Sequence, residues 1–368
     1  MVDQLQEPKG AAARDHPSPA SPIARLALVG AIVGTVLVAF AYAGGWLTPW
    51  QLTPARLVDT FEQVNGPHPG FRRNHAKGVS VSGTFESTGR AATLSRAVVF
   101  RPGRVPVVGR FSLAGGNPNA ADSPETVRAL AIRFSLPDGE EWRTAMISLP
   151  VFPVRTPEAF RDQLVAMSVD PRTGKPDAAK VQAFLAAHPE SARALTVIKA
   201  EKLSSGFENT TYYGLNAFEL VSSSGKSTPV RWSMVPLQPF VPAAAQPAAG
   251  DPNFLFDALI AQVERGPLRW RLVLTIGQPG DPTNDATIAW PADREQIDAG
   301  TLTIDRIESD DSSPVRNITF DPLVLPNGIT TSDDPLLSAR SATYSVSFTR
   351  RVGEPASPSA VPPSAIHP

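Results

Sequence analysis

Residues 26–47 carry no charged side chain, and this apolar run constrains the fold more than any other feature of the chain. A helix needs about 20 apolar residues to cross a bilayer, so the run is long enough to span one. Arg25 precedes the run and Trp46 ends it, which places the N-terminus in the cytoplasm and the bulk of the chain outside. We expect a disordered cytoplasmic tail over residues 1–25, an anchor over 26–47, one large domain over 48–352 and a Pro-rich disordered tail over 353–368.

A cleaved signal peptide is the alternative to an anchor. Ala41-Tyr42-Ala43 before Gly44 fits a signal-peptidase site, and cleavage between Ala43 and Gly44 would release a secreted domain. We favour the anchor because the apolar run continues beyond that site to spanning length.

The composition limits the chemistry that the domain can carry. With 368 residues, of which 42% are hydrophobic, the chain can bury a large core and enclose a cofactor. A formal net charge of -1 provides no basic field, so we expect no nucleic-acid partner. The lack of cysteine excludes disulfides, iron–sulfur clusters and thiolate ligation of zinc or haem.

Short strand-like runs, separated by Gly, Pro and Asn, dominate the domain. They occupy residues 79–85, 105–113, 129–134, 142–147, 212–221, 230–235 and 268–276. Helical patterns begin at Thr53 and cover residues 156–160, 177–187 and 253–264, and the Pro/Ala-rich stretch 236–252 is interpreted as an extended linker. Such spacing is typical of an antiparallel barrel, so we predict an α+β fold in which helices and long irregular loops surround a β-barrel.

Two sites in the domain carry side chains that can move a proton or hold a metal. His75 lies in His-Ala-Lys-Gly, and a histidine can take a proton from one peroxide oxygen and return it to the other. Arg340 and Tyr344 are four residues apart and share a helix face, and an adjacent guanidinium favours the phenolate that ferric iron takes as a ligand. Taken without context, an Arg and a Tyr four residues apart are more often part of an ordinary amphipathic helix than of a metal site. A single histidine is likewise more often a surface residue than a catalytic one.

The surrounding segments resemble the catalase superfamily. The likeness runs from His75 to Arg351 and includes, in the expected order, residues 107–112, 129–134, 150–157, 289–291, 300–304 and 317–337. The sequence shows no counterpart of the N-terminal arm and C-terminal domains of full-length catalases. It is therefore similar to the short, secreted or membrane-anchored catalase-related peroxidases.

This resemblance implies a catalase-like barrel and a set of site residues. A haem, expected to be haem b, would bind with its iron on Tyr344 and with Arg340 beside that ligand. His75 would be catalytic, and Ser112 would hydrogen-bond its ring and fix its tautomer. The implied contacts to the rest of the haem are Arg72, Arg110 and Arg351 on the propionates, Phe134 packed on the macrocycle and Phe160 near the distal pocket.

Three positions depart from the catalase pattern. Where full catalases have a distal asparagine that helps to hold a second peroxide, this chain has Ile147, followed by Ser148. Asn74 replaces a frequent valine, and Asn216 replaces a histidine. We predict a haem peroxidase that reduces hydrogen peroxide or organic peroxides with an external small-molecule electron donor and has weak or no dismutation. The sequence leaves the identity of this donor and the oligomeric state open.

Three other functions remain possible from the sequence. A lipid hydroperoxide could be rearranged or dehydrated by the haem, as some catalase relatives do. A non-enzymatic haem carrier or sensor would need no acid–base group, so the presence of His75 beside the Arg340/Tyr344 pair argues against it. A barrel that binds a partner protein without haem is the third.

Overall fold

The computed structural model describes residues 21–48, 50–243 and 251–362, and the chain divides after Thr53 into two units. The first unit contains one helix, α1 (Pro22–Ala43), which Ser21 caps through a hydrogen bond from the Ala24 N–H. Among the described residues, α1 is the helix long and apolar enough to cross a membrane, and no residue in it is buried.

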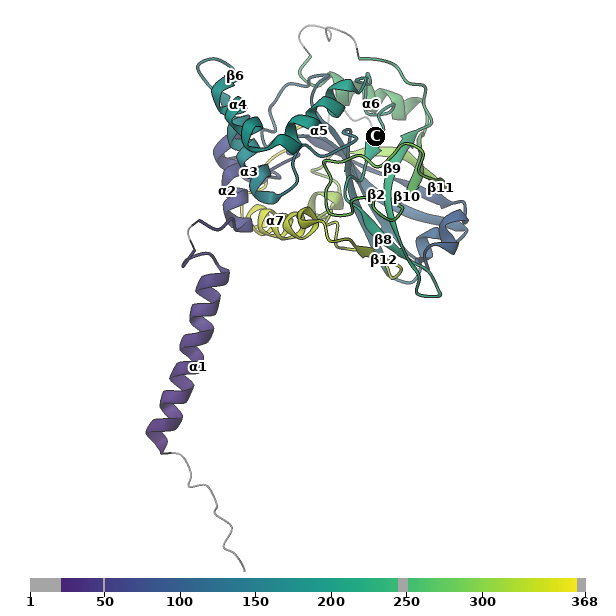
Figure 1. Ribbon diagram of the computed structural model, residues 1–368. Coiled ribbons are helices and arrows are strands. Elements are labelled where there is room, and N and C mark those ends of the chain that lie inside the picture. Colours follow the sequence, from purple (N-terminus) through teal and green to yellow (C-terminus); the bar gives the residue numbers. More distant parts are fainter. Residues whose placement is uncertain (1–20, 49, 244–250, 363–368) are drawn as a thin grey trace, which may run out of the picture. The chain divides into compact units, whose positions relative to one another are not determined.

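The second unit is built on an antiparallel β-barrel (Figure 1). Its longer strands are β1 (Gly78–Ser87), β2 (Gly103–Leu113), β3 (Arg128–Ser135), β4 (Glu141–Ile147), β9 (Ser227–Pro236), β10 (Leu268–Ile276) and β11 (Gln296–Glu308). The short strand β7 (Tyr212–Tyr213) pairs with β4 and β9, and β10 pairs with both β9 and β11. Among the described residues these eight strands close a ring, with β8 (Phe218–Val221) and β12 (Ile329–Thr331) as an extension from β9. The predicted barrel is therefore confirmed.

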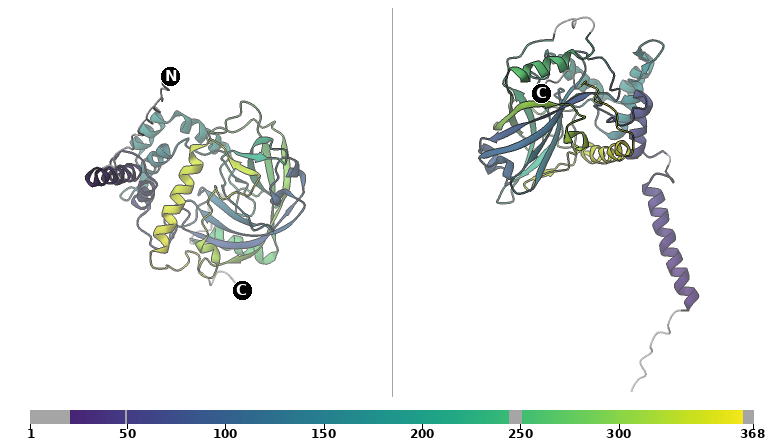
Figure 2. Two further views of the ribbon diagram at one scale, coloured as in Figure 1. Left: turned by 90° about the horizontal axis from the view of Figure 1, so that it is seen from below. Right: turned by 180° about the vertical axis from the view of Figure 1, so that it is seen from behind.

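Helices surround the barrel. They are α2 (Pro54–Asn65), α3 (Pro157–Ala166), α4 (Ala178–Ala187), α5 (Pro189–Ala200), α6 (Phe254–Arg265) and α7 (Pro335–Val352), together with the 3₁₀ turns η1 (Arg90–Thr93), η2 (Val98–Phe100) and η3 (Pro314–Asn317). Figure 2 shows α2 to α5 grouped on one side of the barrel and α7 running along it. A small hairpin, β5 (Val169–Asp170) with β6 (Lys175–Pro176), connects α3 to α4.

The barrel interior forms because side chains alternate along each strand. On β3, Leu130, Ile132 and Phe134 are fully buried in the main hydrophobic cluster, whereas Ala129 and Ala131 point to the opposite, outer face. Strand β1 bends at a bulge between Ser82 and Gly83, where a Cβ on the glycine would collide with the backbone of β11. A space remains between the outer face of β2 to β4 and the helices.

Two expectations differ from the structure. The strand-like run over 212–221 forms two strands, because the extended conformation is interrupted at Gly214 and Leu215, where Leu215 has a φ of 65°. The expectation of a disordered tail from Gly353 is wrong for residues 353–362, since Glu354 pairs with Arg73 and Val361 is fully buried. Residues 1–20, residues 244–250 of the expected linker and residues 363–368 lie outside the described residues.

Candidate functional site

A cavity of about 960 Å³ lies between the outer face of β2–β4 and the helices α2, α3 and α7. Sites for small molecules and cofactors typically have volumes of about 300–1,000 Å³, so this one is large enough for a macrocycle. The structure brings eight of the nine predicted site residues to its wall: Arg72, His75, Arg110, Ser112, Phe160, Arg340, Tyr344 and Arg351. Phe134 is the exception.

His75 borders the cavity from the loop that leads into β1. Its φ of 56° lies in the left-handed region, which a non-glycine residue rarely adopts, and the Asn74 side chain accepts a hydrogen bond from the His75 N–H at 3.0 Å. The Ser112 Oγ lies 3.3 Å from the His75 Nδ1, as the resemblance implies. Burial, followed by the charges of Arg110, Arg340 and Arg72, lowers the pKa of His75 to about 3. The ring is therefore neutral near pH 7, which suits a proton acceptor.

Three arginines gather at one end of the cavity. The Arg110 Nε donates to Asp310 at 2.9 Å, Arg72 donates to three backbone carbonyls of the segment 315–318, and Arg351 donates to the Arg316 carbonyl at 3.0 Å. Burial and the neighbouring guanidinium groups lower the pKa of Arg72 well below its usual value and the pKa of Arg351 to about 10. Although burial opposes it, the charge of Arg110 holds the pKa of Asp310 below its usual value.

This cluster has more positive than negative charge. Arg110 forms an ion pair with Asp310. In addition to burial, the charges of Arg110 and Arg351 lower the pKa of Arg72, and the charge of Arg110 lowers the pKa of Arg351, so an anionic group entering the cavity would relieve their mutual repulsion. The two propionates of a haem supply that charge, and their carboxylates match the bidentate geometry of arginine. The donor set therefore fits a haem at this end of the cavity.

Helix α7 lines the cavity with Arg340, Tyr344 and Arg351. Asp334 caps its start by accepting from the Leu336 N–H, and Pro335 is its first residue. The Arg340 guanidinium carbon lies 5.9 Å from the centre of the Tyr344 ring, which confirms that the two side chains are in contact. Among the described residues, the Tyr344 hydroxyl has no hydrogen-bond partner, so its oxygen is available to a metal in the cavity.

Arg340 is held in place from both sides. Its guanidinium donates to the Asn216 Oδ1 at 2.6 Å and to the Ala145 carbonyl at 3.2 Å. Asn216 in turn donates to Asp334 at 2.8 Å, and burial raises the pKa of that carboxyl. The Asn216 position, noted in the sequence only as a departure from catalases, is therefore the link that orients Arg340 on α7.

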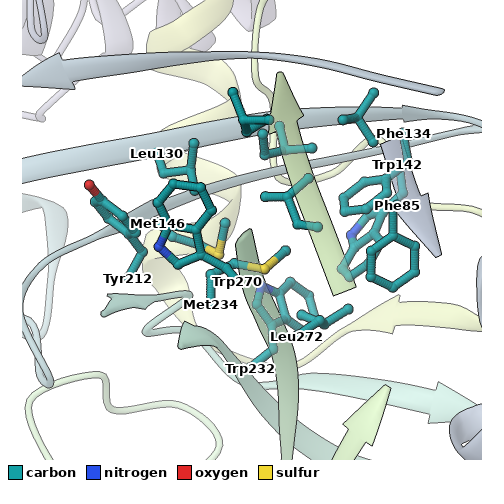
Figure 3. Packing of buried hydrophobic residues seen from close by; sticks show 14 of the residues in the cluster. Phe85, Leu130, Phe134, Trp142, Met146, Tyr212, Trp232, Met234, Trp270 and Leu272 are labelled. Atoms are coloured by element: carbon teal, nitrogen blue, oxygen red, sulfur yellow. The ribbon is translucent and has the colours of Figure 1, made fainter. Parts of the chain in front are cut away.

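Phe134 does not contact the cavity. Its ring stacks on Trp142, with centroids 4.6 Å apart, and meets Phe85 edge to face inside the barrel (Figure 3). The assignment of Phe134 to the haem is wrong because strand alternation turns it to the face opposite Ala131, which does line the cavity. Phe160 lies at the cavity, where it packs on Phe61 and Phe152.

The two substituted distal positions also line the cavity. Ile147 contributes an aliphatic side chain, which cannot donate a hydrogen bond. The Ser148 Oγ accepts a hydrogen bond from the Arg128 N–H at 3.0 Å, which holds this oxygen against the backbone of β3. Sequence reasoning gave no role to Asp310, which pairs with Arg110, because a carboxylate in a polar loop has no distinguishing pattern.

Comparison with known proteins adds independent information. A family model described as Catalase matches residues 46–359. The catalase-related peroxidase of Synechococcus elongatus is 38% identical over 327 residues, which cover 89% of this chain and 94% of that protein. The catalase-related peroxidase of Mycolicibacterium paratuberculosis is 34% identical over 304 residues, which cover 82% and 96%. Rat catalase is 28% identical over 295 residues, which cover 76% of this chain and 56% of that protein.

Solved structures show the same fold. A fungal catalase has a TM-score of 0.71 at 20% sequence identity, and the match covers 86% of this chain and 67% of that one. A bacterial catalase has a TM-score of 0.68 at 23% identity and covers 82% and 61%. These similarities support the barrel with its surrounding helices.

Proposed function

The chain belongs to the catalase family and is an oxidoreductase that acts on peroxide, and we propose that it is a haem peroxidase that uses an external electron donor. The observation that carries this proposal is the convergence of His75, Tyr344 and the three arginines on one cavity, although these residues are far apart in sequence. The excess positive charge at Arg72, Arg110 and Arg351 supports a dianionic cofactor such as haem b.

When bound, the haem would supply the redox centre at which the peroxide O–O bond is cleaved. Tyr344 would hold the iron through its side-chain oxygen, and the Arg340 guanidinium, 5.9 Å from the centre of the ring, lies beside that ligand. His75, neutral near pH 7, takes a proton from one peroxide oxygen and delivers it to the departing oxygen. Ser112 holds the His75 ring at Nδ1, so the other ring nitrogen is the one that moves the proton.

The aliphatic Ile147 determines how the catalytic cycle is completed. Dismutation requires a second peroxide to be oriented in the distal pocket, and Ile147 provides no hydrogen bond for this. A reducing molecule that donates electrons needs no such orientation at His75. We therefore propose that reduction of peroxide by an external donor outweighs release of oxygen.

The test compares two rates in the purified, haem-loaded chain. Oxidation of a phenolic dye with hydrogen peroxide should be readily measured, with oxygen release far slower. Fast oxygen release with negligible dye oxidation would refute the preference for an external donor. In parallel, Tyr344→Phe should remove the absorption bands of ferric phenolate ligation, and an unchanged spectrum would refute Tyr344 as the ligand.

The apolar part of the cavity wall favours a second candidate, the rearrangement or dehydration of a lipid hydroperoxide. Leu164 and Met167 from the α3 region and Leu195 and Ile198 from α5 form a wall suited to an alkyl chain. Incubation with a fatty-acid hydroperoxide in the absence of any electron donor decides between the two. An epoxide or ketone product would support rearrangement, whereas an unchanged hydroperoxide that becomes the alcohol only after a donor is added supports the peroxidase.

We also propose that α1 anchors the protein with its catalytic domain outside the cytoplasm. The support is the length and apolar character of α1 and the position of Arg25 near its N-terminal end. Protease added to intact cells or spheroplasts should digest the domain, and washed membranes should retain the full-length chain. A domain protected until lysis, or one released at the mass expected for cleavage after Ala43, would contradict the anchor.

A further inference from the structure

Asn74 directly precedes His75 and borders the same cavity. Its Oδ1 accepts two backbone hydrogen bonds, from the His75 N–H at 3.0 Å and from the Gly115 N–H at 2.8 Å. Two N–H donors pointing at one side-chain atom fix that atom as the oxygen, because the amide nitrogen in its place would face two donors. The orientation of the Asn74 amide is thus determined by the backbone on both sides.

The Asn74 nitrogen is the free end of this amide. Within the described part of the chain, the Asn74 Nδ2 donates to no acceptor, and the side chain is only partly buried because it borders the cavity. Asn65, another amide in the cavity wall, is already engaged, because it donates to the Phe61 carbonyl. An amide held rigidly by its oxygen, with its N–H groups unpaired beside His75, is suited to bind a small oxygen ligand.

We propose that Asn74 is a catalytic residue that donates a hydrogen bond, from the His75 loop, to the peroxide that is reduced. Ile147, at the end of β4, still offers no donor to a second peroxide. This inference rests on the proposed peroxidase function and assigns a substrate contact within that site. In the overall step, a peroxide ROOH and a donor that gives two electrons and two protons yield ROH and water. Asn74 holds one peroxide oxygen while His75 moves the proton between the two oxygens.

Two substitutions separate this role from a structural one. Asn74→Asp keeps a side-chain oxygen that can accept from His75 and Gly115 and removes the N–H donor. Asn74→Val removes both the acceptor and the donor without adding charge. Asn119→Asp, at an exposed position outside the cavity, is the matched control for the added charge.

The readouts are made on the haem-loaded full chain. The first is the stopped-flow rate of the initial spectral change with hydrogen peroxide, which should fall on the order of 100-fold in both Asn74 variants. The second, independent of turnover, is the dissociation constant of cyanide from the ferric protein, which should rise about tenfold when one hydrogen bond to the ligand is lost. The haem content of the variants and all properties of Asn119→Asp should match the parent.

Each other result overturns the inference. Parental values of the peroxide rate and the cyanide affinity in Asn74→Val would show that the amide N–H has no contact with the ligand. A loss confined to Asn74→Asp would show an effect of charge, and a loss of haem content in both variants would show that Asn74 only shapes the loop. Failure of the proposed function itself is distinct, because the parent chain would then show no reaction with peroxide.

Discussion

The depressed pKa of His75 predicts a specific loss of stability in acid. Burial, Arg110, Arg340 and Arg72 together lower its pKa from 6.5 to about 3 in the folded chain. Below pH 6.5, His75 is therefore protonated in the unfolded chain, whereas in the folded chain it stays neutral down to about pH 3. Stability is thus lost as the pH falls through this window, by about 2 kcal/mol between pH 7 and pH 5 and by at most about 5 kcal/mol at its lower end.

The assay measures the free energy of unfolding in denaturant at pH 7 and pH 5 for the haem-free full chain in detergent and for His75→Gln. Glutamine does not titrate, so the loss between the two pH values should be about 2 kcal/mol smaller in the variant. All other titrating groups are common to both proteins and cancel in the difference. Equal losses in the two proteins would refute the conclusion that His75 is held neutral by burial and by its arginine neighbours.

Three further predictions concern particular contacts. Phe134→Ala should lower the free energy of unfolding by about 3–5 kcal/mol without changing the haem spectrum. Phe160→Ala should change the spectrum. Altered haem absorption in Phe134→Ala would contradict the position of Phe134 inside the barrel. Arg351→Met should weaken haem binding at least tenfold in a transfer assay to apomyoglobin, and parental affinity would exclude contact with a propionate. Glu354→Gln should lower the free energy of unfolding by about 1–3 kcal/mol, because it removes the ion pair with the mostly buried Arg73. An unchanged free energy of unfolding would show that this contact of the described C-terminal segment adds no stability.

The sequence by itself determined the parts of this protein that depend on local pattern. Alternating residues predicted the barrel strands, and the uncharged run predicted α1, because periodicity and length are properties of consecutive residues. Spacing of four residues also placed Arg340 against Tyr344, since both lie on one face of α7. The resemblance to catalases directed attention to eight residues that do line the cavity.

Only the tertiary structure decided which way side chains face and with what they pair. The resemblance assigned Phe134 to the haem, but the register of β3 points its side chain to the interior of the barrel. Asp310 and Asn216 become partners of Arg110 and Arg340 through contacts across 200 and 124 positions of the sequence, which no local pattern encodes. The pKa of His75 likewise depends on burial and on arginines from other elements, because electrostatic fields act through space and not along the chain.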